Sequence, residues 1–171
     1  MRARRGAAAA FAGLWAIAIA CGPSSGTADA PAFDDAHRAA IRDSVQVFLA
    51  EYSALVESGA YDRLIGLYAD VEDFVWIEDG RVAYRSRAEI EEAFAGLRSM
   101  NAEVRTTYVD PDIVALAPGL ASVASGLDQE FVMESGSFGF QGAVSATLVH
   151  TPDGWRFLRG HTSTVRPDGE R

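Results

Sequence analysis

The segment TPDGWRFLRGHTSTV (residues 151–165) ends the series of β-forming stretches that decides the fold of this chain. From residue 104 onward, stretches rich in valine, threonine and aromatic residues alternate with short turn sequences. The stretches are residues 104–109, 113–117, 120–132, 138–150 and 155–165, and the breaks between them are 110–112, 118–119, 134–136 and 151–154. This pattern predicts successive antiparallel strands joined by tight turns.

The sequence before residue 100 predicts helices instead. One apolar stripe recurs at intervals of four and three residues, as expected for an amphipathic helix. Its members are Ile41, Val45, Phe48, Tyr52 and Leu55. Asp34 or Asp35 can cap this helix at its start, and Ser58-Gly59 can end it. A second, shorter helix is expected over residues 61–68.

A hairpin and a third helix complete this half of the chain. Asp79-Gly80 lies between two β-forming stretches, residues 74–77 and 82–84, which is a strong hairpin pattern. Ser86 and Glu89 form a capping box that begins a helix. Its apolar face includes Phe94. Helices followed by antiparallel strands indicate an α+β fold, with the helices packed on one face of a curved sheet.

The first thirty residues predict export and a lipid anchor. Arg2, Arg4 and Arg5 precede an uncharged apolar run that ends at Ala20, as in a signal peptide over residues 1–20. The only cysteine, Cys21, follows at once, which resembles the acylated cysteine of bacterial lipoproteins. The alternative is ordinary cleavage with a free Cys21. Residues 22–32 are small and polar and are expected to act as a flexible tether.

Length and charge restrict what the remainder can do. With 171 residues, 49% of them hydrophobic, the chain suits one globular domain, which we expect over residues 33–171. The formal net charge is -9, and removal of the leader's three arginines leaves 12 basic and 24 acidic residues. Because so acidic a protein repels phosphate backbones, we exclude nucleic-acid binding. We expect the mature protein on a membrane through its lipid, in the outer membrane or on the periplasmic face if the host has two membranes.

Five local phrases follow one another in an order that covers most of the chain: SGAYD (58–62), LYAD (67–70), the helix start at Arg87, DGWRF (153–157) and HTS (161–163). Together they resemble the nuclear transport factor 2-like superfamily, which includes the SnoaL-like and ketosteroid-isomerase-like domains. The resemblance implies a cone-shaped α+β barrel, in which three N-terminal helices pack on a strongly curved antiparallel sheet. It also implies a pocket open at one end and a homodimer formed through the outer face of the sheet.

The same resemblance suggests roles for individual residues. In the ketosteroid-isomerase branch, a tyrosine and a neutral aspartic acid bind an oxyanion while a second aspartate moves the proton. The tyrosine corresponds to Tyr52 and the proton-transferring aspartate to Asp79. The neutral aspartic acid falls at Ala146, which cannot supply it. The alternatives are that Tyr52 is a core aromatic residue and that Asp79 serves only the Asp-Gly turn.

Other candidates lie on the predicted strands. His161 is either an acid–base group in the pocket or a half-buried sheet histidine bonded to a neighbouring strand or a dimer partner. Trp76 and Phe140 are expected to line the pocket or the core, and Asp128 and Gln141 are candidate polar pocket residues whose facing the sequence leaves open. The histidines and the single cysteine follow no metal-binding spacing, so we expect neither a metal nor a cofactor.

These observations favour a lipid-anchored envelope protein whose pocket binds a small, largely apolar ligand without an assignable catalytic activity. One alternative is an isomerase or cyclase that transfers a proton next to a carbonyl group, with Tyr52 as oxyanion donor and Asp79 or His161 as base. A second alternative is an interaction module that dimerises through its sheet.

The lipid anchor makes a direct prediction. Cys21→Ser removes the only thiol that could be acylated, so the variant should move from the detergent phase to the aqueous phase in a detergent partition experiment. An unchanged partition of the Cys21→Ser protein would contradict the anchor.

Overall fold

The computed structural model describes residues 33–165. The expected signal peptide over residues 1–20, the lipidation site Cys21 and the tether over residues 22–32 lie outside these residues. Within residues 33–165, none of the helices combines the length and the apolar character needed to cross a membrane.

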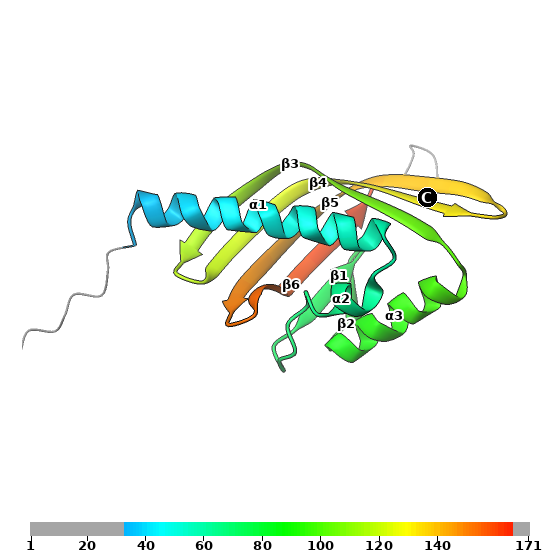
Figure 1. Cartoon of the computed structure of the whole chain (residues 1–171), viewed down its shortest axis with the longest axis horizontal. Helices are drawn as coiled ribbons and strands as arrows, with labels where there is room; N and C mark the ends of the chain where they lie inside the picture. The colour runs from blue at the N-terminus through cyan, green and yellow to red at the C-terminus, as the bar shows by residue number, and fades with distance from the viewer. Residues whose placement is uncertain (1–32, 166–171) are drawn as a thin grey trace, which may run out of the picture. The chain divides into compact units, whose positions relative to one another are not determined.

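The expected α+β fold is confirmed, with the helices packed on a curved, six-stranded sheet that does not close (Figure 1). The elements in chain order are α1 (Asp35–Glu57), α2 (Tyr61–Ile65), β1 (Val75–Glu78), β2 (Arg81–Tyr84), α3 (Arg87–Ser99), β3 (Glu103–Ala117), β4 (Leu120–Met133), β5 (Gly136–Thr151) and β6 (Gly154–Thr164). Strand order in the sheet is β2-β1-β6-β5-β4-β3, so β2 and β3 form the edges.

Helix α1 follows from the predicted stripe and cap. The Asp34 carboxylate accepts a hydrogen bond from the His37 backbone N–H at 2.9 Å, which satisfies one of the free donors of the first turn. Ser58 is the C-cap, and Gly59 follows with a φ of +65°, a left-handed conformation that glycine adopts without strain. The helix lies along the concave face of the sheet (Figure 1) and buries one side against it: Val45, Phe48, Leu49, Leu55 and Val56.

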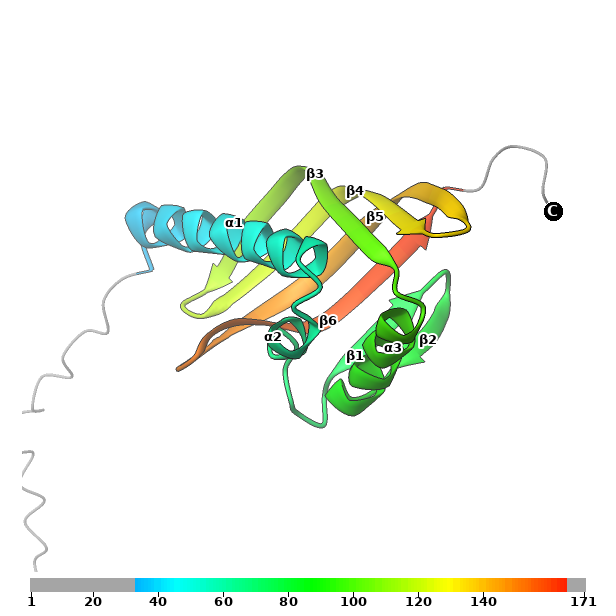
Figure 2. The same ribbon diagram turned by 45° about the vertical axis from the view of Figure 1, so that its right-hand side comes forward.

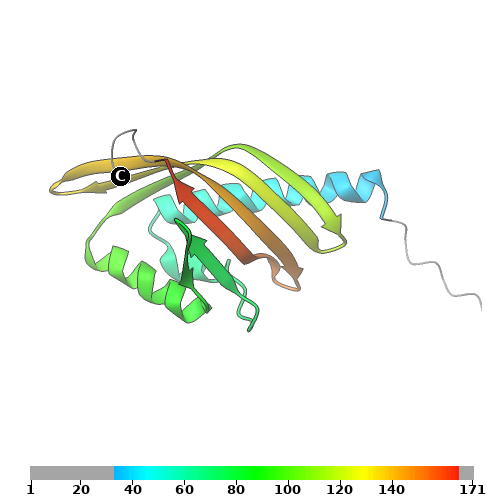
Figure 3. The ribbon, with the colours of Figure 1, turned by 180° about the vertical axis from the view of Figure 1, so that it is seen from behind.

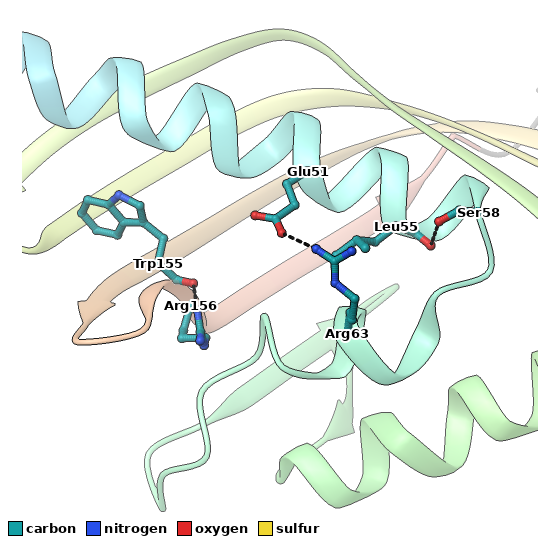
Figure 4. A network of polar contacts seen from close by, with 6 residues as sticks. All are labelled: Glu51, Leu55, Ser58, Arg63, Trp155 and Arg156. Carbon is teal, nitrogen blue, oxygen red and sulfur yellow. Dashed lines mark hydrogen bonds and ion pairs between the residues drawn. The ribbon is translucent and has the colours of Figure 1, made fainter.

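The second helix is shorter than the sequence indicates. It ends at Ile65, because Tyr68 instead forms a parallel bridge with Phe157 of β6. Arg63 of α2 reaches Glu51 of α1 at 3.4 Å (Figure 4), but both side chains are largely exposed and the pair adds little stability.

Ser86 caps α3 as expected, but the second bond of the expected capping box goes to the residue before the cap. The Ser86 side chain accepts from the Glu89 backbone N–H at 3.3 Å, and the Glu89 carboxylate accepts from the Arg85 N–H at 2.6 Å. Figure 2 shows α3 beside the hairpin of β1 and β2. The helix therefore closes the part of the concave face that α1 does not reach.

The sheet is antiparallel except at one place. Strand β1 pairs in parallel with β6, while every other neighbouring pair is antiparallel. This parallel pair carries the β1–β2 hairpin alongside β6 and so completes the curved wall. Figure 3 shows the opposite face of the sheet, which no helix within residues 33–165 covers.

Two β-bulges change which side chains face the helices. The expected break at residues 110–112 is instead a bulge within a continuous β3, where Asp110 has a φ of +48°. The second bulge lies in β6, where Phe157 pairs with Leu148 but Arg159 already pairs with Thr147. Each bulge adds one residue to its strand, so the inward-facing positions change from even to odd in β3 and from odd to even in β6.

Phe157 is the centre of the core. Only 1% of its surface is exposed, and its ring makes edge or tilted contacts with four other rings. These rings belong to Phe48, Tyr52, Tyr68 and Trp76. Its backbone N–H donates to the Leu67 carbonyl at 2.8 Å, and its carbonyl accepts from the Ala69 N–H at 2.9 Å. One residue thus joins α1, the segment after α2, β1 and β6.

Truncation of core aromatic residues should separate packing from pocket lining. Phe48→Ala removes a buried ring that contacts Phe157, so we expect a loss of about 3–5 kcal/mol in the free energy of unfolding. Phe94→Ala should cost less, because Phe94 is only partly buried and one side of its ring faces a cavity. Equal losses in denaturant unfolding would show that this assignment of the two rings is wrong.

Candidate functional site

A cavity of about 460 Å³ lies between the three helices and the concave face of the sheet. Its volume is within the range of small-molecule sites in proteins. Its lining includes five tyrosines, one tryptophan and three phenylalanines, which are Tyr52, Tyr61, Tyr68, Tyr84, Tyr108, Trp76, Phe94, Phe131 and Phe140. The chain contains only five tyrosines, so every one of them faces this cavity.

Tyr52 of α1 and Tyr68 of the segment after α2 form a hydroxyl pair. The Tyr52 and Tyr68 oxygens are 2.8 Å apart, and since one hydroxyl donates to the other, one proton remains available to a ligand. Burial raises the pKa of Tyr52 to about 12 and also raises the pKa of Tyr68 well above its ordinary value. Both phenols therefore stay protonated near neutral pH and act as neutral hydrogen-bonding groups.

Tyr108 of β3 and Tyr84 of β2 extend this polar cluster. The Tyr108 ring packs edge-on against Tyr52 with centroids 5.9 Å apart, and burial raises the pKa of its hydroxyl too. Burial, followed by the negative charge of Glu78, raises the pKa of Tyr84. The cavity thus combines apolar ring faces with several phenolic hydroxyl groups.

Asp79 lies at the turn that the sequence indicates. Asp79 and Gly80 have φ angles of 46° and 79°, and Glu78 pairs with Arg81, which defines a two-residue hairpin loop. The Asp79 carboxylate also accepts from the Thr164 backbone N–H at 2.8 Å and from the Thr164 hydroxyl at 3.1 Å. The side chain therefore holds the end of β6 against the hairpin at the edge of the cavity.

Glu78 is the other carboxylate that lines the cavity. The residue keeps considerable exposed surface, yet burial raises the pKa of its carboxyl group, and the charge of neighbouring Asp79 raises it further. Glu78 shares a strand face with Trp76, two residues before it. Trp76 fits there because Gly160 lies opposite, where a Cβ atom would overlap the indole ring.

Uncharged polar groups lie on the sheet wall. The Gln129 amide donates to the Thr106 hydroxyl at 3.0 Å, which joins β4 and β3 inside the cavity. Thr162 and Thr164 of β6 also line it. These groups can offer hydrogen bonds to a ligand without adding charge.

Of the seven pocket residues selected from the sequence, four line the cavity and three lie on the other face of the sheet. Tyr52, Asp79, Trp76 and Phe140 line the cavity. His161, Asp128 and Gln141 instead lie on the outer face of the sheet and are exposed.

The position of His161 has a specific physical cause. Simple alternation places it on the same face as Trp155 and Phe157, both of which are buried. The bulge at Leu158 reverses the alternation, so Gly160 and Thr162 face inward and His161 faces outward. His161 therefore cannot act as a base in this cavity.

The sequence analysis did not select Glu78 as a cavity residue, nor four of the five tyrosines: Tyr61, Tyr68, Tyr84 and Tyr108. For Glu78 a signal existed, because the two-residue period of a strand places it on the same side as Trp76. For the tyrosines no local pattern was available, since they come from separate elements that only the fold brings together.

No group of three or more histidine, cysteine, aspartate or glutamate side chains within residues 33–165 is arranged to hold a metal ion. The chemistry that this site offers through its described residues is hydrogen bonding by phenols, contact with aromatic faces and proton exchange at a carboxyl group.

A family model described as the SnoaL-like domain matches residues 45–167. The chain belongs to the SnoaL-like domain family. The match covers α1 from Val45 onward and every later helix and strand, and thus all the residues that line the cavity. A search of curated proteins finds no match to this SnoaL-like chain.

Solved structures share the fold of this SnoaL-like domain. A protein of Novosphingobium aromaticivorans, provisionally named a scytalone dehydratase, is 16% identical with a TM-score of 0.67, covering 78% of this chain and 96% of its own. A provisionally named dehydratase of the nuclear transport factor 2-like family from Streptomyces avermitilis is 16% identical, with a TM-score of 0.65 and coverage of 76% and 99%. A Caulobacter vibrioides protein with a cystatin-like fold is 24% identical, with a TM-score of 0.58 and coverage of 74% and 91%.

The raised pKa of Glu78 predicts a pH-dependent stability of this SnoaL-like domain. The folded state binds the Glu78 proton more tightly than the unfolded state does, so stability falls as pH rises through the raised pKa. Glu78→Gln removes this cost. The variant should therefore melt at a higher temperature than the wild type at neutral pH, and the difference should disappear below the ordinary pKa of glutamate.

Thermal melts over a pH series measure this difference. Glu91→Gln, which removes the same charge from an exposed position on α3 outside the cavity lining, is the matched control. A melting-temperature difference for Glu78→Gln that does not change with pH would contradict the assignment.

Proposed function

We propose that the cavity binds a small, largely apolar molecule and holds a polar group of that molecule at the tyrosine hydroxyls. The observation that carries this proposal is the convergence of all five tyrosines on one cavity of about 460 Å³. Sites for small molecules are typically apolar with a few placed polar groups. Here the free proton of the Tyr52–Tyr68 pair is such a group.

The composition of the wall supports an apolar ligand. Ile90, Ala93 and Leu97 of α3 line the cavity together with Phe94, and Leu127 and Val144 contribute from the sheet. Burial of ligand surface against such side chains stabilises a complex by about 25 cal/mol per Å² of apolar area, before the cost of association.

We propose further that the protein is exported and carries a lipid on Cys21. The basic residues, the apolar run and the single cysteine of the leader support this. Such an anchor would keep the binding domain at a membrane surface, where apolar molecules concentrate.

Glu78 supports a second candidate, an enzyme that transfers a proton in the manner of an isomerase, cyclase or dehydratase. Its carboxyl group lines the cavity beside phenols that can stabilise negative charge, and its raised pKa suits proton exchange. Two structural neighbours carry provisional dehydratase names. Turnover of a cyclic ketone or alcohol that is lost in Glu78→Gln, with the fold intact, would favour this candidate.

The binding proposal can be tested by filling the cavity. Ala93 of α3 lines it, so Ala93→Trp should occupy much of its volume. Binding of the neutral apolar dye N-phenyl-1-naphthylamine, followed by its fluorescence, should be at least about tenfold weaker in Ala93→Trp than in the wild type, a change of about 1.4 kcal/mol.

Ala95→Trp is the matched control, because Ala95 lies on the same helix but is exposed and outside the cavity lining. It should bind the dye as the wild type does. Equal binding by all three proteins would place the dye elsewhere and contradict the proposal.

A further inference from the structure

The charged side chains that line the cavity, within residues 33–165, are all acidic. Among the described residues that line it, two are acidic, Glu78 and Asp79, and none is arginine, lysine or histidine. Several arginines instead form ion pairs on the surface, for example Arg87 with Asp70 and Arg98 with Asp62. The Arg98 guanidinium also lies 5.9 Å from the centre of the Tyr61 ring, so Tyr61 already has a cation beside it. A site that binds an anionic ligand usually offers a basic side chain, and this lining offers none.

Glu78 has no positive partner within the described residues. None of the ion pairs or side-chain hydrogen bonds found over residues 33–165 involves its carboxylate. Its charge nevertheless acts on the cavity, because it contributes to the raised pKa of Tyr52, Tyr68 and Tyr84. Partial desolvation disfavours the charged form of a carboxylate, and a bound cation would favour that form.

The aromatic lining adds a second attraction of the same kind. The face of an aromatic ring carries partial negative charge and attracts a cation within about 6 Å. Nine aromatic side chains line this cavity, and the charge of Glu78 contributes to the raised pKa of three of the phenols. Aromatic rings and an acidic side chain therefore line the same cavity.

We infer that the ligand is an organic cation: an amine or quaternary ammonium group, held at Glu78 among the tyrosines, attached to an apolar body that contacts Phe94, Phe131 and Phe140. The inference rests on the proposed ligand-binding function and specifies the chemistry of the ligand. The acidity of the whole protein, with a net charge of -9, also raises the local concentration of cations around it.

Two probes of the same shape test the inference. Phenyltrimethylammonium and tert-butylbenzene differ in charge but hardly in size, and neither can donate a hydrogen bond. Calorimetric titration of the full mature protein should give a Kd for phenyltrimethylammonium at least about tenfold lower than for tert-butylbenzene. In Glu78→Gln this preference should fall several-fold, while in Glu91→Gln, which removes one negative charge away from the cavity, it should persist.

The outcomes separate the two claims. If tert-butylbenzene binds as tightly as phenyltrimethylammonium or more tightly, the cation inference is wrong and the binding function stands. If neither probe binds, the binding function fails as well. A preference for the cation that is equally reduced in Glu78→Gln and Glu91→Gln would reflect the overall charge of the protein and would also overturn the inference.

Discussion

The packing of Phe157 is the contact on which the other elements depend. Its ring meets the ring of Phe48 from α1 and that of Trp76 from β1, while its backbone pairs with the segment that contains Tyr68. Because these contacts join elements far apart in the sequence, they fix the distance between α1 and the sheet. That distance leaves room for a cavity beyond the tyrosines instead of closing it. The site is therefore a direct result of how the core is packed.

Tyrosine is suited to this boundary between core and cavity. Its ring contributes to the core as a phenylalanine would, and its hydroxyl offers a hydrogen bond where the core ends. Tyr52 and Tyr68 satisfy each other at 2.8 Å, so their burial leaves no polar atom without a partner in the absence of a ligand. A wall built in this way has its buried hydroxyls paired when the cavity is empty, and the remaining hydroxyl proton can still donate a hydrogen bond to a ligand.

Local patterns in the sequence were sufficient for most of the fold. The apolar stripe of α1, the Ser86 cap of α3 and the Asp79-Gly80 turn each depend on a few neighbouring residues, and each is observed. The α+β arrangement and the family resemblance were also confirmed, because both depend on the order of such local patterns along the chain. The site was predicted only in part. The tyrosines that line the cavity come from separate elements that only the fold brings together, and the side chains that the last strand turns inward depend on a bulge. A bulge adds a residue without any composition signal of its own, and the one at Leu158 reversed the expected facing of His161.

The bulge in β6 also affects how relatives of this domain should be compared. At 16 to 24% identity, a sequence alignment pairs residues by their order along a strand. It does not show at which position the strand contains a β-bulge. A relative whose last strand has no bulge at this point would turn the other set of side chains, those at the positions of Arg159 and His161, toward its interior. Functional positions in the last strand should therefore be transferred between relatives by superposition of backbones, with Ala146 opposite Gly160 as the reference pair.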